Sequence, residues 1–234
     1  MNKKTKIIVT AVVAGVVVVG TAAVAGPIIY RDLIAGEAAA APTISPAPDS
    51  GEAPAGGDAD PVDVSGTWTV AGGSEAGYRV DEVLNGTDVT VTGRTDDVDG
   101  TLVVDGLTLT DAEITVDVAS IATDSGQRDA YFRDTALRAD EFPTATFALT
   151  EPVTADEVPV GGVQTFEATG ELTIAGVSNE VTFELEAALD GDVGQLAGAI
   201  PITFADYGVE APDLGFVSVE EAGAVEFQLT LARD

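Results

Sequence analysis

Carboxylates are the abundant side chains of this sequence that could take part in chemistry. There are 40 Asp and Glu residues against 10 Lys and Arg, giving a formal net charge of −30 at pH 7, and there is no Cys or His. The missing types supply the commonest general base, the thiolate nucleophile and most transition-metal ligands. A catalytic Ser would have no His partner, and the sequence contains no G-x-S-x-G motif.

The carboxylates could serve in catalysis or in metal binding. A facing pair could hydrolyse a glycoside, and the Asp-rich loops at residues 96–100 and 190–192 could hold calcium. However, adjacent acids arise by chance among so many, and neither loop has the full EF-hand spacing with its distal Glu. We therefore predict no catalytic residue, no metal site and no enzymatic activity, with a carboxylate hydrolase as an alternative.

The arginines are informative because they are few. All three lysines lie in the first six residues, which leaves seven arginines for the rest of the chain. We predict that Arg94, Arg128 and Arg133 hold an anionic headgroup through charge-assisted hydrogen bonds. The alternative is pairing with nearby carboxylates, such as Arg128 with Asp124. The acidic surface would repel nucleic acid, so none is expected as a partner.

The N-terminal region indicates export. Residues 1–6 carry the lysines, and residues 7–30 contain no charge and are rich in Val and Ala. As a helix of about 1.5 Å per residue, this run is long enough to cross a bilayer. The positive-inside rule then predicts a single-pass membrane protein with a cytoplasmic tail at residues 1–6 and its domain outside. The alternative is a signal peptide cleaved after Ala25, which would give a secreted protein.

Two further regions follow. Residues 31–63 are mostly Ala, Pro, Gly and Asp, a composition that predicts a disordered spacer. Residues 64–234 show alternation of apolar and polar side chains, as in Phe166 to Ile174 and Val181 to Ala187. About eight or nine such strands predict an antiparallel sheet that closes into a barrel or folds into a sandwich. One helical segment, from Arg128 to Arg138, is expected at the rim.

The inward faces are predicted to be apolar and aromatic. Small residues also fall on these faces (Ala168, Gly170, Ala187 and Gly198), which favours a cavity over a filled core. An eight-stranded barrel is just wide enough to be filled by side chains or to hold one slim ligand. We predict that the ligand contacts a set of aromatic side chains, namely Tyr78, Phe132, Phe147, Phe166, Phe183, Phe204 and Phe227.

Several strings resemble those of the YceI-like family, in the family's order from about Ser65 to Arg233. They are Val91–Thr95, Thr123–Arg133, Glu141–Phe147, Gly170–Ser178 running into Val181–Phe183, and Phe204–Val209. The resemblance implies an all-β fold, an antiparallel eight-stranded lipocalin-like barrel with one short helix and a long apolar pore. It also implies a bound isoprenoid or quinone-like lipid, no other cofactor and no catalytic residues.

The expected function is therefore to bind or carry an isoprenoid or similar apolar lipid in a barrel outside the cytoplasm, with the membrane as a second partner through the N-terminal helix. The alternative is a surface interaction or structural module with a filled core and no ligand. The sequence does not determine the oligomeric state.

Overall fold

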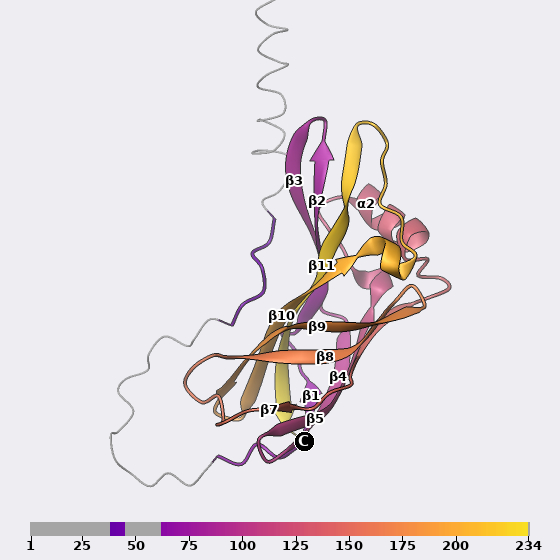
Figure 1. The fold of residues 1–234 in the computed structure, drawn as a ribbon. Helices are drawn as coiled ribbons and strands as arrows, with labels where there is room; N and C mark the ends of the chain where they lie inside the picture. The colour runs from indigo at the N-terminus through magenta and orange to yellow at the C-terminus, as the bar shows by residue number, and fades with distance from the viewer. Residues whose placement is uncertain (1–37, 45–61, 234) are drawn as a thin grey trace, which may run out of the picture.

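One antiparallel sheet of eleven strands makes up the fold in a computed structural model that describes residues 38–44 and 62–233 (Figure 1). Its strands are β1 (Gly66–Val70), β2 (Glu75–Leu84), β3 (Thr87–Thr95), β4 (Val98–Asp105), β5 (Thr108–Asp117), β6 (Thr144–Leu149), β7 (Val153–Thr154), β8 (Gln164–Ile174), β9 (Val177–Asp190), β10 (Val193–Thr203) and β11 (Val217–Arg233).

Eight of these strands close into a barrel, in the order β1-β4-β5-β6-β8-β9-β10-β11, because β1 also pairs with β11. The closing register joins Trp68 to Arg233 and Val70 to Leu231. The predicted closed antiparallel barrel is therefore confirmed. The short strand β7 lies on the edge of β5.

Strands β2 and β3 form a hairpin that continues from the barrel wall. The 17-residue strand β11 pairs with β2 along its first part and with β1 at its end. Its register shifts between Val219 and Gly223, which is where an irregularity bends the strand. We call β2, β3 and the adjoining first part of β11 the arm. The arm extends past the barrel at one end, opposite the C-terminus (Figure 1).

The alternation in the sequence matches the strands closely. In β8, the inward residues Ala168, Leu172 and Ile174 are buried, and the intervening Glu167 and Glu171 are exposed. A two-residue turn joins β8 to β9, and its residues Ala175 and Gly176 have φ of 50° and 78°. Two successive left-handed residues make the type of two-residue turn that suits a twisted hairpin.

A helical segment closes the arm end of the barrel. It consists of α2 (Gly126–Tyr131) followed by a π-helical turn, η2 (Phe132–Ala136), close to the predicted helix. The hydroxyl of Ser125 caps α2 by accepting a hydrogen bond from the Arg128 amide. Leu137 and Ala139, which follow the segment, are buried in one apolar cluster with Leu172 and Tyr207. A second cluster of buried apolar side chains, which includes Trp68 and Leu231, lines the barrel at the end opposite the arm.

Two strands end sooner than the alternation of the sequence predicts. The alternation of Ile114 and Val116 continues to Val118, but β5 ends at Asp117 and Val118 begins the 3-10 turn η1 (Val118–Ser120). The alternation of Ile200 and Ile202 continues to Phe204, but β10 ends at Thr203 and Phe204 begins another such turn, η3 (Phe204–Tyr207). Alternation shows which face a residue occupies while a strand lasts, but it does not show where the strand stops.

The predicted transmembrane helix at residues 7–30 lies outside the described residues, and so does most of the predicted spacer. Within residues 38–44 and 62–233, no helix is long and apolar enough to cross a membrane. The short described segment 38–44 lies along the outside of the barrel, where Ile44 is buried and its amide donates to a Glu186 carboxylate oxygen at 3.0 Å.

Candidate functional site

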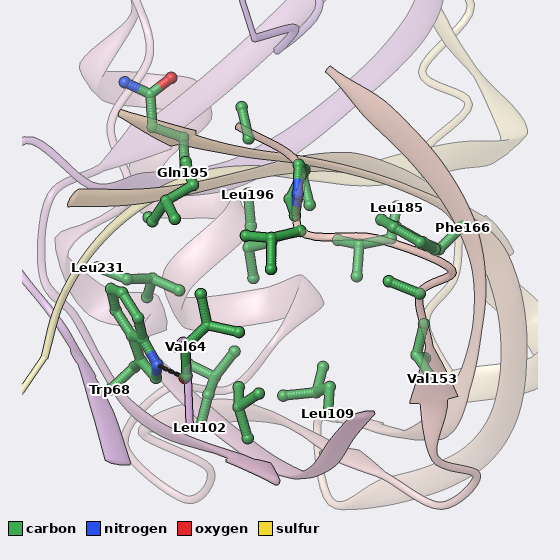
Figure 2. Close-up of a pocket in the computed structure, with 18 of the residues that line it drawn as sticks. Val64, Trp68, Leu102, Leu109, Val153, Phe166, Leu185, Gln195, Leu196 and Leu231 are labelled. Carbon is green, nitrogen blue, oxygen red and sulfur yellow. Dashed lines mark hydrogen bonds between the residues drawn. The ribbon is translucent and has the colours of Figure 1, made fainter. Parts of the chain in front are cut away.

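An apolar cavity lies inside the barrel at the end opposite the arm (Figure 2). Its volume is about 140 Å³, and its walls come from nearly every barrel strand. Trp68, Val64, Leu102 and Leu231 form one wall, and Val153, Phe166 and Leu185 lie across from them (Figure 2). We call this space the outer cavity.

Few polar groups reach the outer cavity. Glu157 lies in the exposed loop at its rim, and the amide of Gln195 points away from the space (Figure 2). The remaining lining is almost wholly aliphatic and aromatic. A space with so few hydrogen-bonding groups offers little to water and suits a hydrocarbon.

The Trp68 side chain, which lines this cavity, is held in place by a hydrogen bond and by a neighbouring guanidinium. It is 4% exposed, its indole N–H donates to the Val64 carbonyl oxygen at 3.0 Å, and the Arg233 guanidinium lies 5.3 Å from its ring centre. The hydrogen bond satisfies the buried N–H and fixes the ring orientation. Sequence reasoning missed Trp68, although it is the chain's single Trp and stands at the start of the alternating region.

A second cavity of about 80 Å³ lies deeper in the barrel, and we call it the inner cavity. The two cavities share wall residues, namely Leu102, Leu109, Leu185 and Leu196. Phe147, Phe183 and Phe227 line the inner cavity, and their rings meet edge to face with centres 5.6 and 5.9 Å apart. The structure therefore brings these three predicted residues together, with Phe166 in the outer cavity.

Two of the small inward residues do not leave empty space. A Cβ on Gly170 would lie 2.4 Å from the Phe147 ring, and a Cβ on Gly198 would lie 2.8 Å from the Phe227 ring. Each Phe thus occupies the volume that its neighbour's missing side chain leaves. Ala168 and Ala187 do line the inner and outer cavities respectively. The prediction that all four small residues make room is wrong for the two glycines.

Comparison with known proteins now identifies the fold's family. Residues 68–231 match the family model of the YceI-like domain. The chain belongs to the YceI-like family. The resemblance inferred from the ordered strings is therefore confirmed. Comparison with curated proteins gives no match.

Solved structures share the YceI-like fold with this chain. A polyisoprenoid binding domain from Saccharophagus degradans superposes with a TM-score of 0.58 at 20% identity, covering 73% of this chain and 99% of that one. BcnA from Burkholderia cenocepacia gives a TM-score of 0.52 at 21% identity, covering 65% and 95% respectively.

The other predicted aromatic residues of this YceI-like chain lie outside the lining of both cavities. Tyr78 of β2 and Phe132, the first residue of η2, stack with ring centres 4.5 Å apart. Phe204 is half-buried, and its ring lies close to Gly223 of β11. These three side chains form part of the closed end of the barrel.

The predicted headgroup arginines are likewise away from the cavities. Arg128 donates to Asp124 at 2.6 Å and to the buried Glu82 at 3.1 Å, so its pairing with Asp124 matches the alternative prediction. Arg133 is half-buried and pairs with Asp134 at 2.8 Å.

Arg94 lies on the outside of the barrel. It shares the buried carboxylate of Glu226 with Arg79, whose Nε lies 2.6 Å from Glu226 Oε1. Each of the three predicted headgroup arginines therefore already pairs with a carboxylate. In the part of the chain that the structure describes, no group of three or more acidic side chains gathers to hold a metal ion.

We expect Gly170→Ala to destabilise the protein by about 1–3 kcal/mol, because the new methyl group would overlap the Phe147 ring and the Ala148 carbonyl oxygen. Denaturant unfolding measures the change. Gly72→Ala is the control, since a Cβ there meets nothing within 4 Å. Equal stability of the Gly170 variant and the parent would show that the Phe147 ring leaves this space free.

Stability should also fall at alkaline pH because of Tyr78. Burial raises the pKa of Tyr78 to about 12. The unfolded chain loses this proton near pH 10, before the folded chain does, so stability is complete below that pH and declines as pH rises towards 12. Between pH 9 and 11.5, the parent should lose about 2 kcal/mol more than Tyr78→Phe. Identical losses would contradict the burial of this hydroxyl.

Proposed function

We propose that this chain binds an isoprenoid or similarly apolar lipid inside the barrel and does not catalyse a reaction. The outer cavity carries the proposal, because nearly all of its lining consists of apolar side chains that a packed core would normally bring into contact. The description of the Saccharophagus degradans neighbour as a polyisoprenoid binding domain supports the same ligand class.

The size of the cavities sets how much of the ligand fits without rearrangement. A dry cavity of about 150 Å³ lined by aliphatic and aromatic groups is large enough for benzene. The outer cavity, at about 140 Å³, therefore holds roughly one isoprene unit. Burial of its five carbons would contribute about 4 kcal/mol, at about 0.8 kcal/mol per carbon group.

A longer tail would continue into the inner cavity. Because the two cavities share four leucines, rotation of those side chains would join them into one channel. Phe147, Phe183 and Phe227 would then contact the deepest part of the tail, and Phe166 the part near the mouth. Tyr78, Phe132 and Phe204 would form the floor beyond it.

The headgroup that fits this mouth is neutral. The rim carries Glu157, and Arg233, which lies beside Trp68, is paired with Asp192 at 3.9 Å. Arg94, Arg128 and Arg133 pair with carboxylates elsewhere. With a net charge of −30, the surroundings also disfavour a pyrophosphate. A quinone or an alcohol head agrees better with this arrangement than the anionic headgroup predicted from the arginines.

We place this binding outside the cytoplasm, with the domain held at the membrane by residues 7–30. The lysines before that run and the acidic residues after it support this orientation. Secretion after signal cleavage is the alternative.

A surface module with a filled barrel is a second candidate function. The packing of Phe147 on Gly170 and of Phe227 on Gly198 favours it, since those rings already occupy the centre of the barrel.

Emission from Trp68 tests the proposal directly, because this single Trp lines the outer cavity. A quinone with a short prenyl tail should quench it saturably, and the same quinone without a tail should not. Ala187→Phe fills the outer cavity and should weaken binding by about tenfold or more, since the tail loses part of its burial. Ala232→Phe, on the exposed face of β11, is the control and should bind like the parent.

Quenching that does not saturate, or that is unchanged in Ala187→Phe, would contradict binding in the outer cavity. Thermal unfolding of both variants shows whether they remain folded. Absence of any quenching in a folded parent would favour the filled-barrel module.

A further inference from the structure

Two large apolar side chains project from the end of the arm. Leu214 and Phe216 are 60% and 58% exposed, and they lie in the loop that leads into β11. This loop stands beside the β2–β3 turn, at the end of the molecule farthest from the outer cavity (Figure 1). We call Leu214, Phe216 and the adjoining turn the tip.

The tip has a defined backbone conformation, because its amide and carbonyl groups are paired in hydrogen bonds. The amide of Leu214 donates to the Val217 carbonyl at 2.8 Å, and the amide of Asn85 donates to the Phe216 carbonyl at 2.7 Å. The Asp213 carboxylate accepts from the Gly215 amide at 3.1 Å. A loop whose backbone is already paired can present apolar side chains to hydrocarbon at lower cost than one with unpaired groups.

The segment 38–44 shows from which end of the barrel the chain arrives. The amide of Ala39 donates to the Thr92 hydroxyl at 3.2 Å, and its carbonyl accepts from Arg79 at 2.6 Å. The segment then runs away from the arm to Ile44, which is bonded to Glu186 of β9 (Figure 1). Its N-terminal side is therefore fixed to β2 and β3, the strands that end at the tip.

The reach of the preceding chain limits the orientation of the barrel. Seven residues, 31–37, separate the predicted anchor from this segment, and when extended they span at most about 28 Å to residue 38. From Thr92 back to Thr87, where β3 begins next to the tip, is about 17 Å. In the opposite direction, β3 and β4 continue to Asp105, which is about 34 Å along the barrel axis after allowing for strand tilt. The tether thus reaches past the tip and falls short of the cavity end.

We infer that the tip contacts the surface of a lipid bilayer, so that the mouth of the outer cavity faces away from the membrane. This inference rests on the predicted N-terminal anchor and is independent of the proposed ligand. Two apolar side chains give a weak and reversible contact alone, and the anchor makes it effective by holding the tip at high local concentration.

The acidic residues around the tip determine which lipid headgroups it can contact. Glu210 and Asp213 precede the apolar pair, and Glu220 and Glu221 follow it. Anionic headgroups would repel these residues, so the contact should be strongest with zwitterionic lipid and should weaken as anionic lipid is added. Added salt should restore it by screening the repulsion.

The experiment uses the full chain, which has no cysteine of its own. Phe216→Cys places a single environment-sensitive NBD label on the tip, and Val160→Cys places the same label at the cavity end. The two positions are matched, since Val160 is 56% exposed. Each labelled chain is reconstituted in phosphatidylcholine vesicles and examined with and without spin-labelled lipid.

The label at residue 216 should shift to the blue, gain intensity severalfold and be quenched by the spin-labelled lipid, whereas the label at residue 160 should behave as in water. Leu214→Ser in the Phe216→Cys chain should reduce the intensity gain. Both labels remaining in water would overturn the inference, as would a chain that fails to float with the vesicles.

Lipid contact at residue 160 would also overturn it and would place the cavity mouth on the membrane. A change at residue 216 that needs no vesicles and grows with protein concentration would show that a second copy of the chain covers the tip instead. Trp68 quenching in the same samples reports ligand binding separately, so failure of one proposal is not mistaken for failure of the other.

Discussion

The pairing of β1 with both β4 and β11 closes the sheet, and this closure fixes the width of everything inside it. In an eight-stranded barrel, each inward side chain takes space that a ligand would otherwise occupy. Where rings from neighbouring strands lie over glycine, the space is filled, as with Phe147 over Gly170. Where aliphatic side chains line the wall near Trp68, a cavity remains. The closure of the barrel and the register of its strands together therefore determine where rings pack against glycine and where the outer cavity stays open.

The charged groups follow a separate pattern from the interior. Each guanidinium within residues 62–233 lies within 4 Å of a carboxylate, and Arg79 and Arg94 share the buried Glu226. Arg128 of α2 and Glu82 of β2 make a comparable pair. The first two ion pairs join the arm to the barrel strand β11, and the third joins the helical segment to the arm. Arg233, which lies beside Trp68, is itself paired with Asp192 at 3.9 Å. Among the described residues, the open cavity therefore has no unpaired positive charge beside it, which is why a neutral, largely hydrocarbon ligand agrees best with the site.

The sequence predicts the barrel well because alternation is a local signal, and β8, β9 and β11 carry it over many residues. It does not reveal β1, whose five residues are too few to show a period, although β1 closes the sheet. Alternation also shows which face of the sheet a residue lies on, but it does not show at which end of the barrel the residue lies. For that reason, Phe183 was correctly placed inside, whereas Arg128 was expected at the mouth and lies at the closed end. The space beside Gly170 is filled by the Phe147 ring of the neighbouring strand β6. Only the register between β6 and β8 reveals this packing.

The central claim is that the barrel carries an apolar ligand. Native mass spectrometry of the full chain, extracted from its own membranes under mild conditions, tests this most directly. Part of the protein should carry an added mass, which organic extraction should recover as a neutral prenyl lipid. A clean unliganded mass, with no uptake of added prenylated quinone or polyprenol, would contradict it.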